Sequence, residues 1–165
     1  MAEKRIGLIP YAITQQRAGV ERCAIFVTDQ RTILVFARPN STFKSTFGKE
    51  ANKPLEAPVR IDFQSVDINK LATMNDNFSL PHSSIVKFSC GKGVGGYGLW
   101  VLYKDDKGRK LGTFVDFQPH PERLKELKAE GRKASDIKRE YAERCQEIFR
   151  RALPVAIAQE GDWKL

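Results

Sequence analysis

The fold is decided by residues 80–117, which read LPHSSIVKFSCGKGVGGYGLWVLYKDDKGRKLGTFVDF. Apolar and polar residues alternate in three runs, Ser83–Cys90, Tyr97–Lys104 and Lys110–Phe117, and a period of two is typical of strands with one buried face. The first run places three residues on its buried side: Val86, Phe88 and Cys90. The middle run is apolar on both faces, which favours a central or covered strand. Residues 105–108 (DDKG) are typical of a hairpin turn, so the stretch predicts three consecutive antiparallel strands.

Three further strands are expected in the first 37 residues, at Ile6–Thr14, Glu21–Thr28 and Arg31–Ala37. The last two are predicted to form a hairpin about Asp29-Gln30, because aspartate tolerates the turn conformation. Pro10 lacks a backbone N–H, so the first strand is expected to lie at a sheet edge or to contain a bulge.

The alternation stops in residues 38–58, which are rich in Ser, Thr, Asn, Lys and Pro. A loop of this length inserted in a compact domain is often functional or mobile. Beyond it, Val59–Phe63 is expected to be a short strand. The apolar spacing of Val66–Asn75 predicts a helix with Asp67 as its N-cap.

After Phe117 the apolar spacing becomes helical, and residues 119–153 are expected to hold the C-terminal helices. Pro121–Glu130 predicts a short helix ended by Gly131, and Ser135 is expected to cap a longer one that ends at Leu153. The two could equally be one kinked helix. The longer helix has an apolar stripe wide enough to lie on a sheet: Ile137, Tyr141, Cys145, Ile148, Phe149 and Ala152. Residues 154–165 are expected to be a tail, with Trp163 folded back.

Strands followed by helices, without alternating crossovers, predict an α+β protein with an antiparallel sheet. Its 165 residues are expected to form a single domain. A sheet of six to seven strands should twist strongly and bend into a partly open barrel, because closure protects the sheet edges. The C-terminal helix or helices should then cap one open end.

The composition is that of an ordinary globular protein with a formal net charge of +8. Such an excess attracts anionic partners, whether nucleic acid or acidic lipid, although many proteins spread it over solvated surfaces. The three cysteines fall on apolar positions without a Cys-x-x-Cys pair, which predicts reduced core thiols. No signal peptide or membrane span is apparent, so a cytoplasmic location is expected.

Two short motifs carry a family resemblance. One is a hairpin turn leading into an apolar strand (Thr28, Asp29, Arg31, Ile33, Leu34, Val35), and the other is Leu80-Pro81-x-Ser83-Ser84-Ile85. With the Lys-Gly turn and the C-terminal amphipathic helix, residues 6–153 resemble the pleckstrin-homology-like domains of bacteria and archaea, related to the GRAM type. The resemblance implies a seven-stranded bent sheet capped by a helix, used as a binding or assembly module.

Lipid-binding members of that superfamily place several basic residues around the loop between the first two strands. Here the resemblance implies Arg17 and Arg22 as the candidate lipid-type loop, with Glu21 beside them. So few cations disfavour a membrane surface as the partner.

Patterns that would indicate catalysis are weak. Residues 93–98 match G-x-G-x-x-G, but a strand follows instead of the helix that a dinucleotide site needs, which favours a hairpin connection. His82 and His120 lie beside prolines without a metal-ligand partner at suitable spacing, and Asp105 and Asp106 occupy a turn. We therefore expect no catalytic residue, no metal site and no cofactor.

The strongest candidate site is the loop at residues 38–60. It combines five cations with two aromatic residues: Arg38, Phe43, Lys44, Phe47, Lys49, Lys53 and Arg60. Lysines neutralise phosphates and aromatic rings stack on unpaired bases, which suits single-stranded or folded RNA. Alternatively, the loop is simply mobile and its phenylalanines fold back on the barrel. Basic residues of the last long helix are interleaved with glutamates, as in a solvated helix face: Arg132, Lys133, Lys138, Arg139, Arg150 and Arg151.

The sequence therefore predicts a non-enzymatic binding or assembly module. A protein partner is favoured, either a second copy of the chain or a peptide held along a sheet edge or groove. One alternative is an RNA- or ribosome-associated protein that uses residues 38–60, and another is weak binding to anionic lipids.

Overall fold

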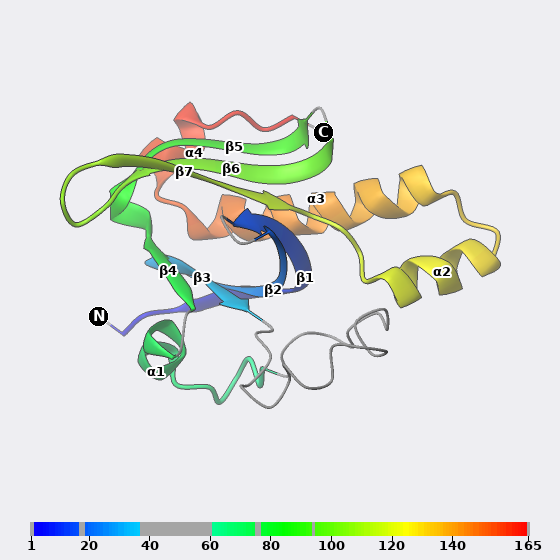
Figure 1. Ribbon diagram of the computed structural model, residues 1–165, viewed down its shortest axis with the longest axis horizontal. Helices are drawn as coiled ribbons and strands as arrows, with labels where there is room; N and C mark the ends of the chain where they lie inside the picture. The colour runs from blue at the N-terminus through cyan, green and yellow to red at the C-terminus, as the bar shows by residue number, and fades with distance from the viewer. Residues whose placement is uncertain (1, 17–18, 37–60, 75–76, 94, 165) are drawn as a thin grey trace.

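Seven strands precede the long C-terminal helices (Figure 1). The computed structural model describes residues 2–16, 19–36, 61–74, 77–93 and 95–164. The strands are β1 (Arg5–Gln16), β2 (Gly19–Thr28), β3 (Arg31–Phe36), β4 (Phe78–Pro81), β5 (Ile85–Gly93), β6 (Gly96–Lys104) and β7 (Lys110–Asp116). The helices are α1 (Ile68–Thr73), the 3₁₀ turn η2 (His82–Ser84), α2 (Pro121–Ala129), α3 (Ala134–Ala152) and α4 (Val155–Glu160).

The strands form one antiparallel sheet in the order β4-β3-β2-β1-β7-β6-β5, which is not closed into a complete barrel. This confirms an α+β protein with seven strands and places the central β6 between β5 and β7, as the sequence predicted. The pairing of β1 with β2 shifts between Ile9 and Ala12. The bulge predicted from Pro10 is therefore present, and β1 curves visibly along its length (Figure 1).

The inner face of the sheet packs against α3. Most of the predicted apolar stripe is buried there: Ile137, Tyr141, Cys145, Phe149 and Ala152. The Phe149 ring centroid lies 5.8 Å from that of Phe88 and 6.1 Å from that of Phe117. All three cysteines are buried and free, as expected for core thiols.

A second, smaller core lies on the outer face of β2 and β3. Phe26 and Ile33 are buried there against Leu71 of α1, and the Phe63 ring lies 5.2 Å from that of Phe26. Asp67 caps α1 by accepting a hydrogen bond from the Lys70 N–H at 3.0 Å, as predicted. Helix α1 therefore covers the outer face of this half of the sheet.

The strand expected at Val59–Phe63 is wrong over the described residues 61–63, which form no strand. The edge of β3 that such a strand would need is occupied by β4, where Leu80 pairs with Thr32. Ile61 and Phe63 pack on the second core instead. The short β4 was not expected as a separate strand, since only four residues separate the preceding turn from η2.

The expected alternation in β5 holds at Phe88 and Cys90, which are buried, but is wrong at Val86, which is 42% exposed. The register between β5 and β6 shifts between Ile85 and Lys87. This bulge inserts one residue, so Val86 is turned out of the core.

Helices α2 and α3 are two separate helices. Gly131 lies between them with φ of 87°, a left-handed conformation that glycine adopts without strain. The expected Ser135 cap is wrong, because α3 starts at Ala134 and Lys133 is its N-cap residue. Asp136 in the first turn supplies the negative charge that a helix N-terminus favours. Residues 155–160 form α4 instead of an irregular tail, since Ile157 and Ala158 pack on the main core.

The segment 161–164 covers the free edge of β5. Asp162 donates its N–H to the Phe88 carbonyl at 3.1 Å and accepts from the Cys90 N–H at 2.8 Å, and Lys92 donates to the Lys164 carbonyl at 2.6 Å. Trp163 folds back as expected, with its ring 5.2 Å from that of Phe88. Gly91 allows this approach, because a Cβ there would lie 1.4 Å from the Lys164 carbonyl oxygen.

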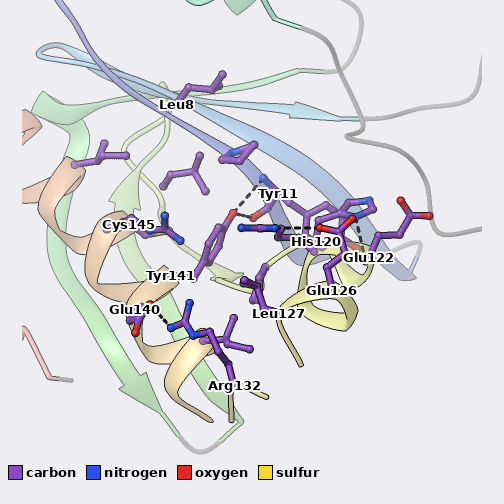
Figure 2. Close-up of a pocket in the computed structure, with 17 residues that line it drawn as sticks. Leu8, Tyr11, His120, Glu122, Glu126, Leu127, Arg132, Glu140, Tyr141 and Cys145 are labelled. Carbon is purple, nitrogen blue, oxygen red and sulfur yellow. Dashed lines mark hydrogen bonds and ion pairs between the residues drawn. The ribbon is translucent and has the colours of Figure 1, made fainter. Parts of the chain in front are cut away.

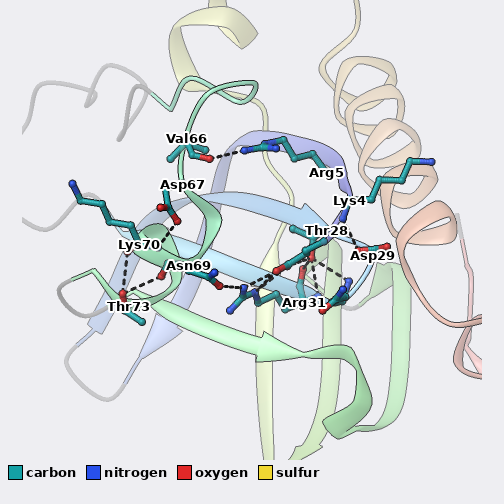
Figure 3. Close-up of polar contacts among 12 residues, drawn as sticks. Lys4, Arg5, Thr28, Asp29, Arg31, Val66, Asp67, Asn69, Lys70 and Thr73 are labelled. Atoms are coloured by element: carbon teal, nitrogen blue, oxygen red, sulfur yellow. Dashed lines mark hydrogen bonds and ion pairs between the residues drawn. The ribbon is translucent and has the colours of Figure 1, made fainter. Parts of the chain in front are cut away.

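The N-terminal residues are fastened to the β2–β3 turn by a polar network (Figure 3). Arg31 donates to both carboxylate oxygens of Glu3, at 2.6–3.1 Å, and to Asn69 of α1 at 2.6 Å. Thr28 also donates to Glu3, at 2.5 Å. Burial alone would raise the pKa of Glu3, but the hydrogen bonds from Arg31 and Thr28 and the Arg31 charge hold it below its usual value.

Replacing Glu3 with glutamine is expected to lower the free energy of unfolding by about 2 kcal/mol, because the Arg31 guanidinium loses its paired acceptors in a mostly buried position. Urea titration measures this change. The matched control is Lys4→Ala, whose backbone N–H still reaches Asp29 and which should change stability by less than about 0.5 kcal/mol. Equal effects of the two substitutions would contradict the structural role of Glu3.

Candidate binding groove

A groove of about 710 Å³ lies between β1, α2 and α3 (Figure 2). Its apolar residues are Leu8, Ile9, Pro10, Tyr11, Pro119, Leu127, Ile137, Tyr141, Cys145 and Ile148. Its polar residues are His120, Glu122, Arg123, Glu126, Arg132, Glu140 and Arg144. The volume is within the range of about 300–1,000 Å³ that ligand sites occupy.

The floor of the groove is set by the β1 bulge. The Tyr141 hydroxyl from α3 donates to the Tyr11 carbonyl oxygen at 2.5 Å and accepts from the Tyr11 N–H at 3.3 Å. Burial raises the pKa of Tyr141, so this hydroxyl stays protonated and remains a donor. The backbone groups freed by the bulge are thereby satisfied, and no strand can pair with β1 at Tyr11.

One wall is the inner side of α2. His120 caps this helix through Nδ1, which accepts from the Glu122 N–H at 3.3 Å, and its ring meets the Tyr11 ring edge-on at 5.1 Å. Helix α2 has no buried residue, and its Leu127 side chain points into the groove (Figure 2). The helix is therefore held at its N-terminus while its apolar side remains partly open.

The charges at the rim largely compensate one another. Arg132 pairs with Glu140 at 2.5 Å, and Arg123 pairs with Glu126 at 3.1 Å. Arg144 lies over the Tyr141 ring, 5.9 Å from its centroid. Three arginines and three glutamates line the groove, so its formal charge is zero with His120 neutral.

The polar chemistry of the groove is limited. Burial raises the pKa of the Cys145 thiol, and it raises the pKa of Cys23 and of Cys90 to about 12, so none of these thiols is activated as a nucleophile. Within the described ranges, no group of three His, Cys, Asp or Glu side chains could hold a metal ion. The groove can therefore bind a ligand through its shape and its apolar surface.

Of the site residues predicted from the sequence, only Arg22 is described, and it does not line this groove. The whole set at residues 38–60 lies outside the described residues, as does Arg17: Arg38, Phe43, Lys44, Phe47, Lys49, Lys53 and Arg60. Arg22, the other cation of the candidate lipid-type loop, donates Nε to the Tyr11 hydroxyl at 3.1 Å. It is thus engaged in supporting β1.

The basic face of α3 shows the charge pairing that its sequence predicted. Arg139 lies 4.0 Å from Asp136 and 3.8 Å from Glu143. The groove itself was missed, because it requires Tyr11 and Tyr141 to meet across 130 positions of sequence. The one signal that the sequence offered was Pro10, which predicts the bulge on which Tyr141 sits.

The comparisons with known proteins identify no relative. No protein-family model, no curated protein and no solved structure matches the chain. In the part of the chain that is described, no helix has the length and apolar character needed to cross a membrane.

Proposed function

We propose that this chain is a non-enzymatic binding module of the pleckstrin-homology-like fold that holds a protein partner in the cytoplasm. The fold part is supported by the seven antiparallel strands in one sheet and by α3 lying across it, the arrangement that the family resemblance implies. Three free, buried thiols support a reducing compartment.

The observation that carries the proposal is the groove between β1, α2 and α3, with its apolar floor and compensated rim. A site without net charge gives no advantage to a polyanion, whereas apolar side chains of a peptide gain from burial there. Because the Tyr141 hydroxyl occupies the backbone groups of Tyr11, an added strand finds no open edge at that point. An amphipathic helix, whose own backbone is satisfied, suits the groove best.

The test is a selection of random 16-residue peptides against the purified protein, followed by titration of the enriched peptides. We expect enriched peptides to carry apolar residues at i, i+3 or i+4, and i+7. Leu127→Asp should weaken their binding at least about tenfold, because it places a charge on the apolar wall. The matched control, Ala129→Asp, changes an exposed residue of the same helix that does not line the groove and should leave binding unchanged.

Enrichment that is equal on the parent protein and on Leu127→Asp would rule out the groove as the binding site. Since α2 contributes no buried residue, Leu127→Asp should keep the parent circular-dichroism spectrum and unfolding midpoint, which separates loss of binding from loss of folding.

A further inference from the structure

Among the described residues, no helix packs on the outer face of β5, β6 and β7, unlike the outer face of β2 and β3. The strand registers assign ten of its outward-facing residues, which we call the open face: Lys87, Ser89, Gly98, Trp100, Leu102, Lys104, Lys110, Gly112, Phe114 and Asp116. Helix α1 buries the corresponding face of the other half of the sheet. The middle strand β6 is thus apolar on both sides, but only its inner side is packed.

Two aromatic residues dominate the open face. Trp100 and Phe114 are directly opposite each other on β6 and β7, and they are 37% and 47% exposed. A Cβ at Gly98 would lie 2.9 Å from the Phe114 ring, so the absence of a side chain there lets this ring lie against the sheet. An exposed aromatic pair of this kind is the usual mark of a binding surface.

Three of the four charged residues in this set are positive. Lys104 and Lys110 are a directly opposed cross-strand pair, and Lys87 is opposite Leu102. Opposed like charges disfavour the sheet, and a bound anion would relieve that repulsion. The face also carries the carboxylate of Asp116, which is opposite Gly98 and accepts a hydrogen bond from the Gln118 side chain at 2.6 Å.

The aromatic pair and the lysines are separated along the strands by a fixed distance. Trp100 and Lys104 are four residues apart on β6, which at about 3.3 Å per residue is about 13 Å. A ligand that contacts both must therefore be extended, with flat apolar groups at one end of the contact and negative charge at the other.

We propose that the open face binds single-stranded nucleic acid, with bases stacked on Trp100 and Phe114 and phosphates held by Lys87, Lys104 and Lys110. Exposed aromatic rings on a flat sheet are suited to unpaired bases, and lysines neutralise the backbone. A lipid surface is less suited, because these rings lie on the broad face of a sheet and not at the tips of loops. This site lies apart from the groove and does not depend on the protein partner proposed there.

The experiment is fluorescence anisotropy of 3′-labelled 12-residue oligouridine and oligodeoxythymidine with the full chain, at several salt concentrations. Trp100→Ala and Phe114→Ala are each expected to weaken binding about tenfold or more, and Phe114→Tyr should restore it, since a tyrosine ring also stacks. Lys104→Ala with Lys110→Ala should reduce the slope of log affinity against log salt by about 1.4, the value for two phosphate contacts on a single strand.

Two controls match these variants. Val155→Ala removes an exposed apolar residue of α4, away from the open face, and Lys125→Ala with Lys128→Ala removes two exposed charges on α2. In both controls, the part of the oligonucleotide affinity that depends on Trp100 and Phe114 should be unchanged. Affinity that is insensitive to Trp100→Ala and Phe114→Ala overturns the proposal. Binding that these two substitutions abolish on phosphatidylserine vesicles, but not on oligonucleotides, overturns it in favour of a lipid surface.

Discussion

Replacing Phe149 with alanine is expected to lower the free energy of unfolding by about 4 kcal/mol, a value typical of a large cavity left in a well-packed core. The Phe149 side chain is 1% exposed, and its ring contacts that of Phe88 on β5 and that of Phe117, which directly follows β7. Its loss therefore weakens the attachment of α3 to the sheet. Chemical denaturation followed by circular dichroism measures the change.

The matched control is Phe114→Ala, which deletes the same side chain from the half-exposed outer face of β7 and should cost only about 1 kcal/mol, mainly the cross-strand pairing with Trp100. Phe149→Leu keeps part of the side-chain volume, so its loss of unfolding free energy should lie between those of the other two variants. It can replace Phe149→Ala in the comparison if the alanine variant does not fold. If the alanine variants at positions 149 and 114 lost equal amounts of unfolding free energy, the assignment of Phe149 to the core and of Phe114 to the outer face of the sheet would be wrong.

Acidification from pH 7.5 to pH 5 is expected to remove about 2 kcal/mol of stability through His82 alone. Its ring is 1% exposed and Nε2 lies 2.9 Å from the Thr32 hydroxyl. Nδ1 has no hydrogen-bond partner among the described residues, and burial of the charged ring outweighs the help it receives from the backbone of Asp29 and Ala152. Burial lowers the pKa of His82 to about 4, although Asp29 and Glu3 oppose this shift.

The direction follows from the two protonation states. The unfolded chain binds a proton at His82 near the ordinary pKa of about 6.5, whereas the folded chain does so only near pH 4. The contribution of His82 is therefore complete above pH 6.5 and is lost as the pH falls towards 4. His82→Gln should remove this dependence, and His120→Gln, which keeps His82, should retain it. A parent protein whose unfolding free energy is flat between pH 7.5 and pH 5 would refute this account.

Local patterns were sufficient to predict most elements. The alternation in residues 97–104 and 110–117, the turn at Asp29-Gln30 and the bulge at Pro10 depend on neighbours close in sequence, and each is present. The cap expected at Ser135 is a local error, whereas the strand expected at residues 59–63 fails because of a long-range partner. Ile61 and Phe63 have the composition of a strand, but the edge they would need is taken by β4.

The candidate site was less predictable for the same reason. The groove depends on the contact between Tyr141 and the β1 bulge. No pattern of neighbouring residues predicts a contact between positions so far apart in the sequence. The open face could be assigned only once the register placed Trp100 opposite Phe114 and the structure showed what α1 covers. The predicted site at residues 38–60 lies outside the described residues and stays a prediction.

The pairing of residues 162–164 with β5 has a consequence for synthesis on the ribosome. Strand β5 emerges long before the segment that supplies hydrogen bonds to its outer edge. During that interval its backbone groups are open to any strand nearby, including β5 of a neighbouring nascent chain on the same messenger RNA. Release of the segment from the exit tunnel thus completes the sheet and ends the period in which two chains can pair by mistake.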